Sequence, residues 1–232
     1  GTCPTGLGCT WRQRTAPVRR WSYRPDMENY DVKRDRRDLY APRAGRIDVV
    51  DVPPLRYLMA DGAGDPDTSA DYRAVVEALF TCSYAVRKAC IAELGRKHTV
   101  GPLEGLWSAR DMEVFHTRDK AAWEWTLMIV QPEWVTAELA ATAVETVTTR
   151  SLAAGERVRF AEYAEGPSVQ TLHVGPYDAE GPTIARLHEF AAAEGHALTG
   201  RHHEIYLSDV RRTDPARLRT ILRQLIARAG GQ

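Results

Sequence analysis

The sequence of 232 residues predicts an α+β fold made of two tandem strand-helix-strand-strand modules related by pseudo-two-fold symmetry. We expect an antiparallel sheet with helices on one face and a ligand cleft on the other. Two observations lead to this prediction. The same order of alternating and helix-period apolar patterns occurs twice, at about residues 46–131 and 157–226. The halves also contain similar segments, Gly101–Trp107 and Gly200–Arg212, each with a glutamate among apolar residues.

The first module begins with two short strand signals in residues 47–60, separated by Pro53-Pro54, because consecutive prolines cannot sit in a central ladder. A turn over Asp61–Asp67 follows, and Thr68 or Ser69 can cap the next helix. Gly95 ends that helix. One stripe of the helix carries Tyr72, Val75, Val76, Leu79, Ser83, Val86 and Cys90 at helical spacing. Strands are then predicted around residues 99–107 and 123–130, the second stopped by Pro132.

The second module repeats this order. A strand at residues 170–174 leads through a turn into a helix from about Pro182 to Gly195, and a strand at 201–208 follows. The apolar run Leu218–Ile226 fits a strand or a helix equally well. Between the modules, residues 136–149 predict a helix and residues 157–163 a strand.

The first 26 residues follow neither the strand nor the helix period. We expect them to be a disordered or non-native leader, with Met27 as the natural start; a basic arm that uses the arginines of this stretch is the alternative. Residues 27–232 would then form the small-molecule-binding domain, with residues 27–45 as a charged and loosely packed lead-in.

Composition limits the class of function. With 31 basic and 31 acidic side chains, nothing favours nucleic acid or an anionic membrane as a partner. No apolar run approaches the ~20 residues of a membrane span. The four cysteines form no disulfide framework, so we expect a reducing cytoplasm. The histidines and cysteines lack metal-ligand spacing, and no metal site is expected.

Glu204 is the leading candidate for chemistry. In an alternating strand it shares a face with His202 and Tyr206, while Ile205 points to the opposite face. An isolated strand glutamate is usually a solvated surface residue. In a ring-lined cleft, however, desolvation would raise its pKa, and the carboxylate could attract a cation or act as a general base. Glu104 is a second, weaker candidate at the matching place in the first module.

Aromatic side chains gather in the duplicated region, and such a group is more often core than binding site. Trp123 and Trp125 share a strand face and could stack on a planar ligand. For a cationic ligand, ring faces and Glu204 would act together. The predicted ligand-binding rings and polar groups are Tyr57, Trp107, Trp123, Trp125, Glu104, His202 and Tyr206.

Four segments carry a resemblance to a known family: residues 31–40, 102–107, 125–132 and 201–209. On these segments the chain resembles the GyrI-like small-molecule-binding domains, which are also the effector-binding domains of AraC-type and MerR-type multidrug regulators. The resemblance covers about residues 27–232 and implies two fused modules with a ligand cleft between them. It also implies a glutamate in the cleft, at the position of Glu204. Because no helix-turn-helix pattern precedes the match, we expect a stand-alone member.

Some stand-alone members that this chain is similar to hydrolyse cyclopropanoid genotoxins, and this implies a detoxifying hydrolase as the first hypothesis. Glu204 would activate water, and a tyrosine hydroxyl from Tyr72, Tyr177 or Tyr206 would stabilise the carbonyl oxygen as it gains charge. No metal or organic cofactor is needed. The second hypothesis is a non-catalytic protein that sequesters planar, lipophilic or cationic drugs. The third is a protein partner that inhibits DNA gyrase.

Overall fold

The computed structural model describes residues 28–109, 120–149 and 152–228. The predicted leader, residues 1–26, lies outside these ranges. Within them, the first module consists of β3 (Leu55–Ala63), α3 (Ala70–Ala89), β5 (Leu103–Ala109) and β6 (Trp123–Gln131). The second consists of β8 (Gly166–Val174), α6 (Gly181–Ala193), β9 (His196–Tyr206) and β10 (Arg219–Arg228). The strand-helix-strand-strand order is therefore confirmed in both halves, and the ambiguous run after Leu218 is a strand.

The remaining elements precede or join the modules. Two short helices, α1 (Val32–Asp35) and α2 (Arg37–Tyr40), lie between β1 (Asn29–Tyr30) and β2 (Asp48–Val52). A short strand, β4 (Lys97–His98), pairs with β1. The predicted connection between the modules is confirmed as α5 (Ala137–Thr148) and β7 (Arg159–Tyr163). None of the helices in the described ranges combines the length and apolar content that a membrane crossing requires.

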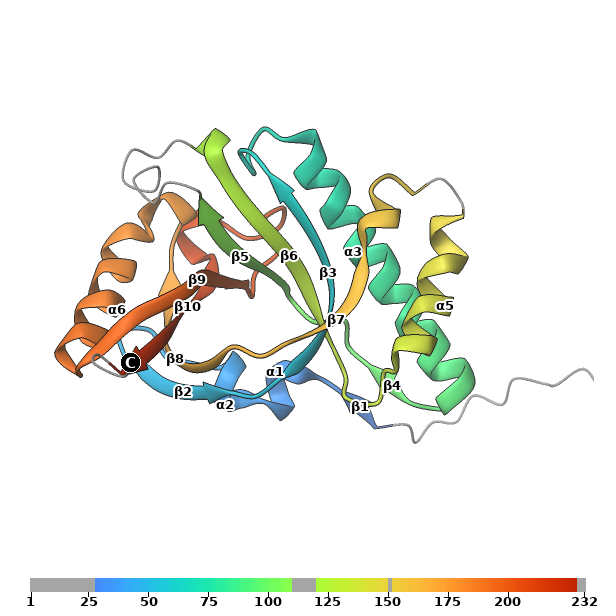
Figure 1. Cartoon of the computed structure of the whole chain (residues 1–232), viewed down its shortest axis with the longest axis horizontal. Coiled ribbons are helices and arrows are strands. Elements are labelled where there is room, and N and C mark those ends of the chain that lie inside the picture. Colours follow the sequence, from blue (N-terminus) through green and yellow to red (C-terminus); the bar gives the residue numbers. More distant parts are fainter. Residues whose placement is uncertain (1–27, 110–119, 150–151, 229–232) are drawn as a thin grey trace, which may run out of the picture.

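The principal sheet has the strand order β2-β8-β10-β9-β5-β6-β3-β7 within the described residues, and its strands pair antiparallel (Figure 1). The modules meet at the central pair, β5 and β9. The edges are exchanged: β2, which precedes the first module, pairs with β8 of the second, and β7, which precedes the second, pairs with β3 of the first. β2 is the first strand of this order and β3 the last but one, yet only Pro53 and Pro54 separate them in sequence. The two ends of the sheet therefore lie close together, and the sheet is strongly curved.

Local signals in the sequence explain the helices. The side-chain oxygen of Ser69 accepts a hydrogen bond from the Tyr72 backbone N–H, and Gly95 adopts a left-handed φ of 63° just after the helical segment. The predicted stripe of α3 is buried at Val75, Leu79 and Val86. It packs against the sheet and, together with α5, forms the largest apolar core.

All three long helices cover one face of the sheet. Leu58 and Leu127 pack with α3 and α5, while Val169 and Leu222 pack with Leu187 of α6. Leu222 is paired with Glu204, and paired residues share a face, so the Glu204 side chain points to the helix face. The prediction that the helices and the Glu204 site would lie on opposite faces is therefore wrong. α3 packs against β3 and β6 of its own module, and α6 packs against β8, β9 and β10 of the other.

The opposite face is covered by α1 and α2, which appear below the sheet in Figure 1. Leu39 and Tyr40 are 0% and 2% exposed and pack with Tyr57, Leu106 and Ile205. Residues 27–45 were expected to be loosely packed. The described part of this segment instead closes a core, because Val32, Leu39 and Tyr40 are buried against the sheet.

Candidate functional site

A chain of hydrogen bonds links three side chains at the centre of the helix face. The Trp107 indole Nε1–H donates to the Tyr206 hydroxyl over 3.1 Å, and this hydroxyl donates to Oε2 of Glu204 over 2.7 Å. Trp107 comes from β5 and the other two residues from β9, so the chain crosses the boundary between the modules. The Glu204 side chain keeps 16% of its surface exposed and is therefore not sealed from ligands.

Gly105 makes room for this arrangement. It lies directly opposite Glu204 in the β5–β9 ladder. A Cβ atom at this position would come within 2.9 Å of Trp107 Nε1 and 3.3 Å of the Tyr206 hydroxyl. The sequence thus leaves one residue without a side chain where the indole and the phenol meet.

Aromatic rings from both helix regions surround Glu204. Tyr72 of α3 lies 6.4 Å from the Trp107 ring in a stacked orientation, and Trp123 meets Trp107 edge-on at 5.5 Å. On the other side, Tyr177 meets Tyr206 edge-on at 5.6 Å and is 36% exposed. Aromatic rings from both modules therefore lie around the Tyr206 hydroxyl that bonds Glu204.

A second carboxylate, Glu180, belongs to this site and was missed in the sequence. It directly precedes α6 and is only 4% exposed. Burial raises the pKa of Glu180 to about 9, and repulsion from Glu204 adds to the effect. The signal that could have identified it is its position three residues after Tyr177 and immediately before the Gly181-Pro182 helix start. We call the group of Glu204, Glu180, Tyr206, Trp107, Tyr72 and Tyr177 the Glu204 cluster.

Burial also shifts the pKa of Glu204. Desolvation raises the pKa of this carboxyl to about 7, while the hydrogen bond from Tyr206 acts in the opposite direction. Repulsion from Glu204 raises the pKa of Glu180 further, so the two carboxyls titrate as a pair and Glu180 keeps its proton to higher pH than Glu204. A carboxylate with a pKa near neutrality can take a proton from water or hold a cation.

The other side chains predicted on this face have distinct environments. His202 is on the Glu204 face, with Nε2 3.6 Å from Glu204 Oε1, and burial lowers its pKa to about 4. Trp125 is 1% exposed, with its Nε1–H donating to the Gly64 carbonyl and its ring covered edge-on by Tyr72. Trp125 is therefore part of the core, whereas Trp107 belongs to the Glu204 cluster and Trp123 packs against Trp107.

Two predicted ligand-binding residues lie on the wrong face. Tyr57 is 1% exposed and packs under α1 and α2. Glu104 pairs with Ile205 rather than with Glu204, so it points away from the Glu204 cluster. Similar segments suggested equivalent glutamates, but a register difference of one residue reverses the face on which a strand side chain lies.

Glu104 instead belongs to a buried charge network. It accepts hydrogen bonds from the Tyr40 hydroxyl at 2.8 Å and pairs with His203 Nε2 at 3.0 Å. His203 Nδ1 lies 3.0 Å from Glu165, which also pairs with Arg223 at 3.1 Å. We call these five residues the His203 network. Its side chains satisfy one another and hold the lead-in segment to the sheet.

A model of the GyrI-like small-molecule-binding domain matches residues 46–224. The chain belongs to this family. The match spans both modules and includes Glu180 and Glu204 of the cluster. Members of this family bind small molecules.

Solved structures give the same fold. A conserved protein from Listeria innocua is 34% identical with a TM-score of 0.79, and the alignment covers 86% of this chain and 100% of that one. A hydrolase from the same bacterium is 33% identical with a TM-score of 0.74, over 86% of this chain and 100% of its own. The EcmrR C-terminal domain, at 13% identity and a TM-score of 0.52 over 79% of this chain and 98% of its own, shares the fold alone. The search of curated proteins found no significant match.

Proposed function

We propose that this GyrI-like domain binds planar, lipophilic molecules at the Glu204 cluster and hydrolyses cyclopropanoid compounds there. The observation that carries the proposal is the Glu204 carboxylate, which is partly exposed, surrounded by rings and raised in pKa to about 7. A general base with such a pKa works well near neutral pH. The likeness to hydrolases of about one-third identical sequence supports an enzymatic role.

In the proposed reaction, Glu204 takes one proton from a water molecule while the water oxygen attacks a carbon of the strained ring. The bond to the spiro carbon breaks, and its electron pair passes through the conjugated system to the carbonyl oxygen. That oxygen then takes up a proton, so the overall reaction adds one water to the substrate. Relief of ring strain supplies the driving force, and no cofactor enters the step.

Tyr72 and Tyr177 are the proposed donors to the carbonyl oxygen. Burial raises the pKa of Tyr72 above its usual value and that of Tyr177 to about 12, so both hydroxyls keep their protons at neutral pH. A donor aimed at an oxygen that gains charge stabilises the transition state more than the ground state. Tyr206 is less suited to this role, because its hydroxyl proton is already donated to Glu204.

The test is turnover of a cyclopropanoid substrate, followed as the ring-opened product with one added water by mass spectrometry. Glu204→Gln should lower kcat by about 10²–10⁴-fold, because the amide cannot accept the proton, while ligand binding persists. Glu162→Gln, an exposed glutamate on β7, is the matched control and should leave kcat unchanged. Wild-type turnover in Glu204→Gln would rule out the proposed base.

A cation-binding protein without turnover is the second candidate. It is favoured by the pairing of two carboxylates, Glu180 and Glu204, with aromatic rings, since ring faces and carboxylates together attract organic cations. Calorimetry with ethidium and a neutral phenanthridine would distinguish it. Loss of affinity for the cation alone in Glu204→Gln, with no hydrolysis by the wild type, would favour this function.

A further inference from the structure

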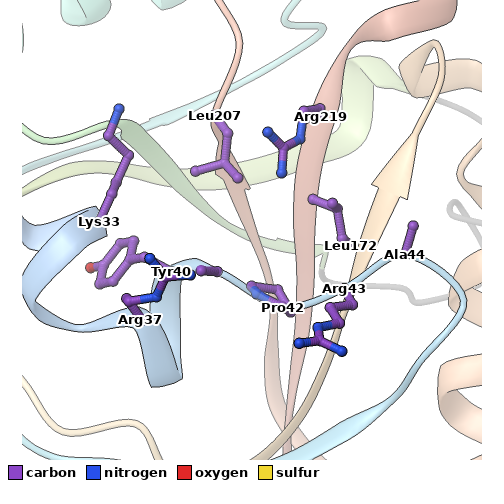
Figure 2. Close-up of a pocket in the computed structure, with 10 residues that line it drawn as sticks. Lys33, Arg37, Tyr40, Pro42, Arg43, Ala44, Leu172, Leu207 and Arg219 are labelled. Carbon is purple, nitrogen blue, oxygen red and sulfur yellow. The ribbon is translucent and has the colours of Figure 1, made fainter.

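A separate pocket of about 540 Å³ lies on the opposite face of the sheet from Glu204. Figure 2 shows it between the α1–α2 segment, which supplies Lys33, Arg37 and Tyr40, and the strand side, which supplies Leu207 and Arg219. Its size falls within the range of small-molecule sites, which is roughly 300–1,000 Å³. We call it the basic pocket.

The charged residues that line the basic pocket are all cations. They are Lys33, Arg37, Arg43 and Arg219. All four are exposed, and none forms an ion pair with a carboxylate of the described residues. Since the whole chain carries equal numbers of basic and acidic side chains, this local excess of positive charge does not follow from composition.

Neighbouring arginines of the same segment are neutralised. Arg34 pairs with Asp35 at 3.2 Å, Arg36 with Asp38 at 3.2 Å, and Arg46 with Asp48 at 2.6 Å. The segment thus pairs the arginines outside the pocket with carboxylates and leaves those in the pocket without them. An anion that enters the pocket would not have to displace a carboxylate.

The floor of the pocket is apolar and fixed. Tyr40 and Leu172 are 2% and 6% exposed, and Pro42 is buried beside them. Two side chains of the sheet donate hydrogen bonds to the backbone of the lead-in segment. Gln170 donates to the Asp38 carbonyl over 2.8 Å, and Arg223 donates to the Leu39 carbonyl over 2.8 Å. A ligand would therefore meet a preformed surface and would not have to order it, which favours binding.

From this arrangement we infer a second ligand site, which takes a small organic phosphate with an apolar body. The phosphate would contact the guanidinium groups, whose forked donors match its oxygens, and the apolar part would rest on Leu172, Leu207 and Pro42. A dianion is favoured over a monocarboxylate because four cations surround one pocket. A nucleic-acid strand is less suited, because the cations surround one pocket and do not follow an extended groove.

The experiment uses calorimetry on the full chain with 1-naphthyl phosphate, inorganic phosphate, 1-naphthol and a single-stranded oligonucleotide. Naphthyl phosphate should bind with a Kd below about 1 mM and more tightly than either of its parts. Arg37→Gln combined with Arg219→Gln should weaken it by at least about tenfold, since two charge-assisted contacts are lost. Arg34→Gln combined with Arg46→Gln, which removes two paired arginines nearby, is the matched control and should leave its affinity unchanged.

Amide shifts in nuclear magnetic resonance spectra locate the ligand independently. Naphthyl phosphate should shift the amides of residues 37–44 and leave those around Glu204 unchanged, including in Glu204→Gln. The inference is overturned if the shifts centre on Glu204, if phosphate alone binds as well as naphthyl phosphate, or if both double variants bind equally. Tighter binding of the oligonucleotide, lost in the Arg37 and Arg219 variant, would assign the pocket to a polyanion instead.

Discussion

The two central strands each carry a glutamate, and the two carboxylates face opposite sides of the sheet. Glu104 on β5 is 0% exposed and receives hydrogen bonds from Tyr40 and His203. Glu204 on β9 receives one from Tyr206, keeps part of its surface exposed and faces the second carboxylate, Glu180. On one face the charges compensate one another, and on the other they do not.

The difference shows how burial alone fails to identify a functional acid. On the Glu104 side, desolvation would raise the pKa of Glu165, but His203 and Arg223 lower it to about 2. The neighbouring carboxylates in turn raise the pKa of His203. On the Glu204 side the attraction of His203 and Lys120 is too weak to offset desolvation, and both carboxyl pKa values rise. Compensated charges stabilise the fold, whereas an uncompensated acid remains available for a ligand.

The largest expected effect comes from removing one member of the His203 network. Glu165→Gln leaves Arg223 buried without its carboxylate and should lower the free energy of unfolding by about 3–5 kcal/mol. Glu204→Gln should change it by less than about 1 kcal/mol, because no lysine or arginine of the described residues forms an ion pair with that carboxylate. Urea denaturation of both variants measures the difference. Equal losses of stability would mean that the two faces do not differ as described.

Gly105→Ala tests how closely the Glu204 cluster is packed. The added methyl would meet the Trp107 and Tyr206 side chains at 2.9 and 3.3 Å, so we expect a loss of about 1–3 kcal/mol in unfolding free energy. Tryptophan fluorescence should change as well, because the indole must move. Gly181→Ala, where an added Cβ meets nothing within 4 Å, is the control. An unchanged stability in Gly105→Ala would show that the cluster tolerates repacking.

The smallest effect concerns the titration of Glu204. The hydroxyl of Tyr206 bonds the ionised carboxylate and lowers its pKa, so Tyr206→Phe should raise that pKa above about 7, by up to about one unit. The base form of Glu204 accumulates as pH rises through its pKa, and any activity that needs it would shift to higher pH. Carboxyl carbon shifts measured against pH report the change without requiring turnover. Tyr40→Phe, on the other face, should leave the Glu204 titration unchanged.

Local patterns were sufficient to predict the modules. The apolar stripe of α3, the cap at Ser69 and the break at Pro53-Pro54 each act over a few residues, and the structure has each of them. The environment of Glu204 also followed from alternation, because Tyr206 and His202 are its neighbours two residues away on the same face.

Features that depend on pairing between distant strands could not be predicted. The ladders place Glu104 beside Ile205 and Met128, and Tyr57 beside Val130, and these registers decide that both side chains lie away from Glu204. Helix placement has the same origin: which strands α3 and α6 cover depends on the strand order of the sheet, which no local pattern specifies. The basic pocket combines Arg37 and Arg219, which are far apart in sequence and come together only because the lead-in segment crosses the sheet.

The exchanged edge strands have a consequence for the integrity of the chain. A cut in the connection between α5 and β7 would leave two fragments, yet each fragment would still supply the border strand of the other, through β2 on β8 and β7 on β3. Separated, each fragment would expose unpaired strand edges of the kind that promotes aggregation. The duplicated halves are therefore not independent units, and a nicked molecule should remain whole until it is denatured.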